Sequence, residues 1–242
     1  MNTLLWTQRL LAFSVLLQTI ELWRVRAAVS ADGIWPWRVV REDFDFFPPL
    51  LRRFLDATLA YPNFLGLLLL QVFASLTLFW SLWAAPVLLL TTVLVSLRWR
   101  GAFNGGSDYM TVAVLLPLAA AALADHPVVV LACLWYVALQ CCFSYFVAGV
   151  VKLSRANWRN GKALMAFTGG RLSLAWARWL SWLVIGFQCA FPLALLWPAL
   201  CPVFVLGALG FHLGNFYLFG LNRFLWAWLA TYPALFYCAA YR

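Results

Sequence analysis

The chain has 242 residues, of which 65% are hydrophobic and 10% are charged, and its formal net charge is +9. Soluble domains are about half apolar and about a quarter charged, so this composition excludes an ordinary soluble domain. It predicts an integral membrane protein with an all-α fold, built as a single domain over residues 1–242. We expect the lipid membrane as its surroundings and no nucleic-acid partner.

Apolar runs along the chain predict a helical bundle of about eight transmembrane helices. Residues 64–97 form one run, which as a single helix would be about 51 Å long, against a hydrocarbon layer of about 30 Å. Ala84-Ala85-Pro86 breaks this run into two spans. The predicted spans are residues 4–23, 64–82, 85–97, 109–124, 128–151, 174–197, 202–219 and 224–241.

Basic residues fall mainly on one side of this arrangement. The loops at 24–63, 98–108, 152–173 and 220–223, together with Arg178, hold fifteen of the 17 Lys and Arg residues. The positive-inside rule makes this side cytoplasmic and places both termini outside. We expect the protein in the inner (plasma) membrane of a bacterium.

Two of these loops have the composition of interfacial segments. Residues 34–58 mix aromatic residues with Arg and Asp, and residues 153–173 contain Trp158 and several arginines. Such side chains have an apolar part and a polar part, and therefore suit the headgroup region of a bilayer.

Polar residues also occur in or beside the predicted spans. Arg9, Gln18 and Glu21 lie on the first span, and Glu21 sits close to the interface. Contact of Arg9 with lipid would be costly, so Arg9 should point into the bundle and find a partner. The sequence does not name the partner of Arg9. Residues 103–109 contain a Gly-Gly turn, after which Asp108 either caps the fourth span or acts as an acid or base.

Lys152 ends the fifth span and is one of only two lysines in the chain. Helical spacing places it on one face with Tyr145, Ala148 and Gly149, where the small residues let a helix or a flat ligand approach the backbone. Lysine loses its proton readily on burial, so Lys152 is a candidate base or anion-binding group at a pocket mouth. Alternatively, it snorkels to the headgroups or bonds the last helix carbonyls.

The seventh span contains a second polar pair, His212 and Asn215, on one helical face. Such residues in a membrane helix should face protein or a cavity, so they either join two helices by a hydrogen bond or line a pocket. Small residues form a stripe on another face of this helix, at Gly207, Gly210 and Gly214.

The six cysteines lie in or beside apolar runs, and none forms a CxxC pair or stands near a histidine at metal-ligand spacing. We therefore expect them to act as small apolar residues, and we expect no metal site.

Two segments resemble a known family. Residues 145–164, YFVAGVVKLSRANWRNGKAL, form an aromatic-rich helix that ends in Ala-Gly-x-x-Lys-Leu and is followed by Trp and Gly. Residues 211–233 place a His before an Asn, a Leu-Phe pair and an Ala-x-x-Pro end. Both segments resemble the HTTM superfamily, which includes the membrane domain of the vitamin K-dependent gamma-carboxylases. Lipase maturation factors are similar in the first segment.

The resemblance implies a quinone as ligand and a catalytic role for Lys152, because the matching carboxylase lysine is regarded as the base that reacts with the reduced quinone. Candidate ligand-binding residues are Tyr145, Gly149, His212 and Asn215. Peptide gamma-carboxylation is not expected. The carboxylases' large lumenal region has no counterpart, Gly-Gly-Ser replaces a catalytic-site histidine, and the charge pattern places Lys152 toward the cytoplasm. Whether the protein is an enzyme stays open.

We expect an HTTM-type protein that binds a quinone-like or lipid ligand between helices and assists maturation or electron transfer in a partner protein. The alternative is a non-catalytic subunit or scaffold that docks other membrane proteins through its aromatic and small-residue faces. A transporter is a third alternative, but no pair of matching broken helices predicts inverted repeats.

Overall fold

The computed structural model describes residues 2–99 and 105–241, and over these residues it contains helices and no strands. The all-α fold expected from the composition is therefore confirmed. The chain forms two compact units, residues 1–130 and residues 131–242. The single domain expected from the sequence stays a prediction.

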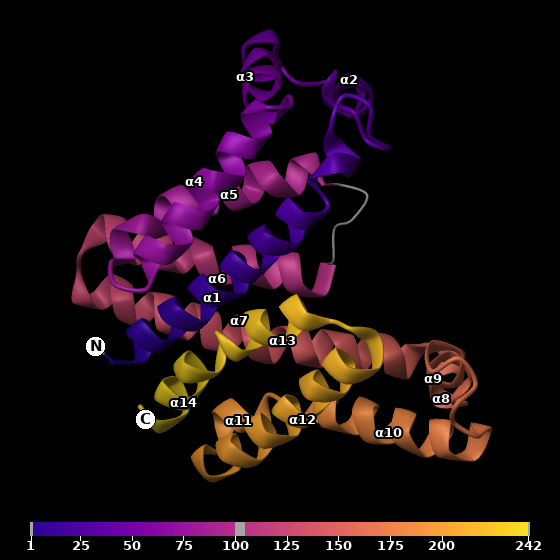
Figure 1. Ribbon diagram of the computed structural model, residues 1–242. Helices are drawn as coiled ribbons and strands as arrows, with labels where there is room; N and C mark the ends of the chain where they lie inside the picture. Colours follow the sequence, from indigo (N-terminus) through magenta and orange to yellow (C-terminus); the bar gives the residue numbers. More distant parts are fainter. Residues whose placement is uncertain (1, 100–104, 242) are drawn as a thin grey trace. The chain divides into compact units, whose positions relative to one another are not determined.

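The first unit is a bundle of helices (Figure 1). Its elements are α1 (Asn2–Arg24), η1 (Arg26–Val29), α2 (Trp37–Val40), η2 (Arg41–Phe44), α3 (Pro49–Leu59), α4 (Asn63–Leu78), η3 (Leu82–Ala84), α5 (Ala85–Arg98) and α6 (Gly105–Ala124). The helices α1, α4, α5 and α6 pack against one another. The turn between α4 and α5 begins before the predicted break, because Pro86 fits the first turn of α5, where its missing N–H removes no helical bond.

Buried polar side chains join these four helices. Gln18 on α1 donates to the Asp108 carboxylate on α6, with Nε2 and Oδ1 3.1 Å apart. Thr19 donates to Gln71 on α4 over 3.1 Å, and Gln71 donates to Thr92 on α5 over 3.1 Å. Hydrogen bonds of this kind offset the cost of burying polar groups in an apolar bundle. Gln18 therefore points into the bundle.

Arg9 also finds its partner within the first unit. Its Nε donates to the carbonyl oxygen of Phe79 over 3.3 Å, and its guanidinium lies 5.9 Å from the centre of the Trp6 ring. Phe79 follows the last residue of α4, where a helix leaves carbonyl oxygens without internal donors. The partner that the sequence does not name is thus a backbone carbonyl at a helix end.

A buried arginine joins three connecting segments at one end of this unit. Arg98 is the last residue of α5 and is 1% exposed. Its Nη2 donates to the carbonyl oxygens of Val29 and Trp35, each over 2.7 Å. Its Nε donates to that of Leu59 over 3.1 Å. The end of α3 and the segment after α1 are thereby fixed to the end of α5.

The second unit contains most of the long helix α7 and the helices that follow it (Figure 1). These elements are α7 (Pro127–Ser154), α8 (Ala156–Arg159), α9 (Lys162–Phe167), α10 (Leu174–Ala190), α11 (Leu193–Leu196), η5 (Pro198–Leu200), α12 (Cys201–Phe219), α13 (Asn222–Leu229) and α14 (Tyr232–Ala240). The short helices α8 and α9 pack against α10, and α12 packs against α11, α13 and α14.

Three helices in the described part of the chain are long and apolar enough to cross a membrane: Gly106–Ala124, Pro127–Ser154 and Pro198–Phe219. A fourth span exists if Pro49–Leu59 and Asn63–Leu78 count as one, although they meet at an angle of 78°. The prediction of membrane helices is thus supported at these places, but the length and composition of the helices support fewer spans than the eight predicted.

The shortfall arises because four predicted spans are short or broken helices, and because α1, although 23 residues long, is not among the helices that are apolar enough to cross a membrane. The apolar helix at Leu82–Arg98 is too short to be counted among the spans. The predicted span at 224–241 is interrupted after Leu229, so that α13 and α14 share it. The predicted span at 174–197 is likewise divided between α10 and α11. Periodicity and hydropathy place these helices, but they do not reveal such breaks.

Candidate functional site

Lys152 lies in the last turn of α7 and is half-buried. Its Nζ donates to the carbonyl oxygen of Ala148 over 3.3 Å and lies 5.1 Å from the centre of the Trp158 ring on α8. The first contact joins the ammonium group to a carbonyl one turn earlier on its own helix, and the second is at a cation–π distance. Together they hold the ammonium group beside a groove.

We call this feature the Lys152 groove; it has a volume of about 500 Å³. Its polar lining residues on α7 are Gln140, Ser144 and Lys152, which are four and then eight residues apart, so that they line one side of the helix together with Ala148 between them. Gln140 Nε2 donates to Ser144 Oγ over 3.3 Å. The remaining lining residues are Phe143, Val147, Ala148, Val151 and Trp158. Such a lining suits a molecule with an apolar body and one polar or anionic end.

A separate group of polar residues, the Tyr145 cluster, lies buried in the second unit. The Tyr145 hydroxyl on α7 is 2.6 Å from His212 Nε2 on α12 and 3.0 Å from the Tyr232 hydroxyl on α14. Beside them, the Thr231 hydroxyl donates to Cys141 Sγ on α7 over 3.2 Å. The cluster therefore joins α7 to α12 and α14 through side-chain hydrogen bonds.

Aromatic rings enclose the Tyr145 cluster. Phe191 stacks on Tyr145 with ring centroids 3.8 Å apart, and Trp228 lies 4.5 Å from the Tyr145 ring and 5.1 Å from the His212 ring. His212 Nδ1 is buried and has no hydrogen-bond partner among the residues that the structure describes. These contacts give the cluster the geometry of a buried hydrogen-bond network that holds three helices together.

The structure therefore places the predicted site residues in different surroundings. Lys152 lines the groove, whereas Tyr145 and His212 bond each other in the buried cluster. Of the two alternatives for His212, the hydrogen bond between helices is the one that the geometry contains.

Gly149 and Asn215 serve packing and local structure. A Cβ atom on Gly149 would lie 2.7 Å from the backbone nitrogen of Cys189, so glycine is needed where α7 meets α10. Asn215 Nδ2 donates to the carbonyl oxygen of Phe211 on its own helix over 2.7 Å.

Asp108, the other candidate acid or base, belongs to the first unit. It lies in the first turn of α6, is buried, and accepts the hydrogen bond from Gln18. Residues 103 and 104 of the predicted turn fall outside the described residues. The carboxylate therefore contributes to the packing of α6 on α1.

Gln140 and Tyr232 are among the residues of these two sites that the sequence did not single out. Gln140 stands three helical steps of four residues before Lys152 in an otherwise apolar helix, and this spacing is a signal that could have found it. Tyr232 meets Tyr145 only through tertiary packing, because 87 residues separate them.

Comparison with protein-family models, with curated proteins and with solved structures finds no match. Membership of the HTTM superfamily therefore stays a prediction from the two sequence segments, and the function has to be argued from the geometry.

Proposed function

We propose that the protein is an HTTM-type integral membrane protein that binds a quinone-like or lipid ligand in the Lys152 groove. Through this ligand it assists maturation or electron transfer in a partner protein. In this proposal the shorter helices also lie within the bilayer and complete a bundle of about eight spans. The basic loops face the cytoplasm of a bacterium, and both termini lie outside.

The observation that supports this proposal most is the polar stripe in the groove. Gln140 and Ser144 are only partly buried, yet they lie on a candidate membrane span. Amide and hydroxyl groups are costly against hydrocarbon unless they find partners. A ligand with carbonyl or hydroxyl oxygens would bond these groups, and its apolar part would cover Phe143 and Val147.

Lys152 would supply the charge at the end of the groove. Its ammonium group has three N–H donors, of which one bonds the Ala148 carbonyl. Another would then be directed to an oxygen of the ligand. If the protein is an enzyme, a neutral Lys152 amine would take a proton from a ligand hydroxyl, which leaves an ammonium ion and an oxyanion.

The experiment compares the two lysines. We expect Lys152→Ala to lower ligand affinity by roughly ten- to a hundredfold, since a hydrogen bond to a charged group contributes about 1.5–3 kcal/mol. Lys162→Ala is the matched control, because Lys162 is exposed on α9 and does not line the groove. Solvent extraction and mass spectrometry of the purified proteins would measure bound quinone and lipid per chain.

Equal retention of the ligand by the two variants would remove the role of Lys152. A wild-type protein that carries a stoichiometric protein partner and no small molecule would contradict ligand binding altogether.

One observation supports the second candidate, a scaffold that docks other membrane proteins. Only 22% of the most apolar stretch of Pro198–Phe219 is buried, so most of α12 is left uncovered by the rest of the chain. A Cβ atom on Gly210 or Gly214 would meet nothing within 4 Å. Small residues spaced by four on an open membrane helix allow close approach of another helix.

A further inference from the structure

The helix α3 leaves large apolar side chains uncovered. Leu50 is 81% exposed and Phe54 is 46% exposed, and Leu51 is exposed as well. On the same helix, Leu55 and Leu59 are buried in the core of the first unit. Only part of the apolar surface of α3 is therefore used for packing.

The uncovered and the buried apolar residues form one continuous face. At about 100° per residue, Leu51 and Phe54 follow Leu55 around the helix on one side, and Leu50 comes next. The charged residues occupy the other side and are Arg52, Arg53 and Asp56. The apolar face thus continues beyond the edge of the bundle toward whatever surrounds the first unit.

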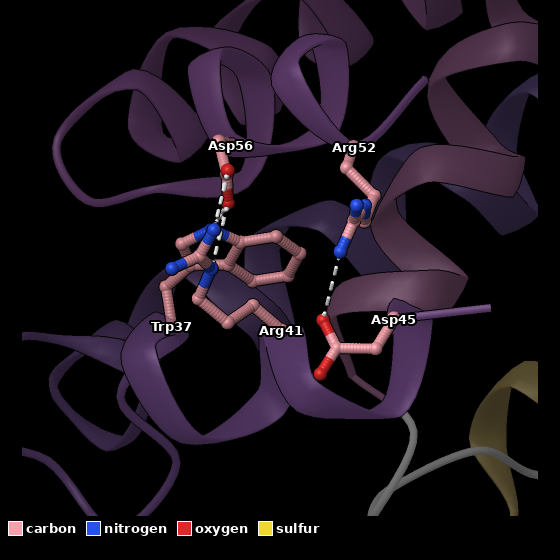
Figure 2. Close-up of polar contacts among 5 residues, drawn as sticks. All are labelled: Trp37, Arg41, Asp45, Arg52 and Asp56. Carbon is pink, nitrogen blue, oxygen red and sulfur yellow. Dashed lines mark hydrogen bonds and ion pairs between the residues drawn. The ribbon is translucent and has the colours of Figure 1, made fainter. Parts of the chain in front are cut away.

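The charged side of α3 is fixed by contacts within the chain, as Figure 2 shows. Arg41 forms an ion pair with Asp56 at 2.8 Å, and the Trp37 indole N–H donates to Asp56 over 2.8 Å. Arg52 pairs with Asp45 at 3.4 Å. These contacts neutralise both carboxylates on that side, and they hold α2, η2 and α3 together.

The angle between α3 and α4 indicates how α3 is oriented relative to a membrane that α4 crosses. The two helices meet at 78°, and α4 is an apolar helix within the bundle. If α4 crosses the bilayer, α3 lies close to the membrane plane. The hydrogen bond from Arg98 to the carbonyl of Leu59 fixes the end of α3 to the end of α5, so the exposed face is held in place.

We propose that α3 is an interfacial anchor whose Leu50, Leu51 and Phe54 side chains enter the boundary between headgroups and acyl chains of a phospholipid bilayer. Arg53 is exposed and adjoins Leu50 on the helix surface, where its guanidinium meets lipid phosphate groups. The bent pair of α3 and α4 is then one span preceded by a surface helix. Three charged residues within the eleven of α3 oppose its burial in hydrocarbon.

The test uses a fluorophore on Leu50→Cys in the full-length protein, reconstituted into vesicles of phosphatidylcholine and phosphatidylglycerol. Glu42→Cys is the matched control, because Glu42 is exposed on η2, the element that Arg41 joins to α3 through its ion pair with Asp56. The unmodified protein gives the labelling background of its own cysteines, five of which are buried. Iodide, added on both sides of the bilayer, quenches a fluorophore that is exposed to water. Lipids that carry a nitroxide at a shallow or a deep position quench a fluorophore at the matching depth in the bilayer.

We expect the label at position 50 to emit at shorter wavelength than the label at 42. The shallow nitroxide should quench the label at position 50 several-fold more strongly than the label at position 42. Iodide should quench the label at position 50 much less than the label at position 42. Iodide quenching equal to that at position 42 would show a solvated helix and overturn the proposal. Stronger quenching by the deep nitroxide would make α3 part of a span, and protection from both quenchers would mean that protein covers the face. Either result overturns it too.

Discussion

Arg98 is a charged residue whose hydrogen bonds all go to backbone carbonyl oxygens within the described chain. Burying a charge is costly, and partial charges on three carbonyl groups offset that cost only when they converge on the guanidinium. The planar group suits this arrangement because two of its nitrogens, Nε and Nη2, donate in different directions, whereas lysine would offer its donors from a single nitrogen.

We predict that Arg98→Leu destabilises the protein by about 3 kcal/mol or more, because the carbonyls of Val29, Trp35 and Leu59 lose a charged donor inside the bundle. Arg38→Leu is the control, since Arg38 is exposed on α2, and its effect should stay within about 0.5 kcal/mol. Denaturant unfolding in detergent would measure both free energies. Equal changes for the two variants would contradict a role for the Arg98 contacts.

For single residues, the sequence predicts where a charged side chain stands along a helix better than it predicts which groups that side chain contacts. The place of Lys152 at the end of a helix follows from where the apolar run stops, and the structure agrees. Arg98 also stands where an apolar run stops, and the sequence supports only its assignment to a loop of basic residues. Arg98 differs from Lys152 because it contacts segments that lie 39 or more residues away in the sequence. A local sequence pattern carries no information about such contacts.

The contact between α7 and α10 depends on the absence of a side chain at one position. A Cβ atom on Gly149 would lie 2.7 Å from the nitrogen and 2.8 Å from the sulfur of Cys189. Backbone atoms of a packed helix cannot yield as a flexible side-chain end can, so the helices would have to separate.

We predict that Gly149→Ala lowers the free energy of unfolding by about 1–3 kcal/mol through overpacking. Gly186→Ala on α10 is the matched control, because a Cβ atom there meets nothing within 4 Å. Alanine at that position should be neutral or stabilising by up to about 1 kcal/mol. Thermal unfolding of the two variants in the same detergent would decide; a Gly149→Ala melting temperature at or above the wild-type value would refute the close contact.

Helices as elements are largely predictable here, and their ends are less so. Apolar runs place a helix at each of the eight expected positions, because the hydropathy of twenty residues averages over local detail. The interruption after Leu229 precedes Pro233, which lies in the first turn of α14 and has no N–H to continue the helix. The Thr231 hydroxyl contacts the Trp228 carbonyl and Cys141, and the second of these contacts comes from tertiary structure.

For the molecule as a whole, the open face of α12 separates the two functional proposals. If the protein is mainly a ligand binder, Gly210→Leu should leave both bound ligand and melting temperature unchanged, because the added side chain projects into open space. Gly66→Leu on α4 is the control, since its Cβ atom also meets nothing within 4 Å. Affinity purification followed by mass spectrometry would measure the protein partners and the bound ligand of each variant. Loss of a protein partner from the Gly210 variant alone, with no ligand in either protein, would favour the scaffold.

The order in which the chain is made gives the Arg98 contacts a further meaning. A ribosome synthesises Val29, Trp35 and Leu59 before Arg98, by 69, 63 and 39 residues. Until α5 has been synthesised, these carbonyl oxygens lack the donor that the folded structure gives them. The end of α3 and the segment after α1 therefore acquire their contacts with Arg98 only once α5 is present, so a residue made later completes the fold of segments made earlier.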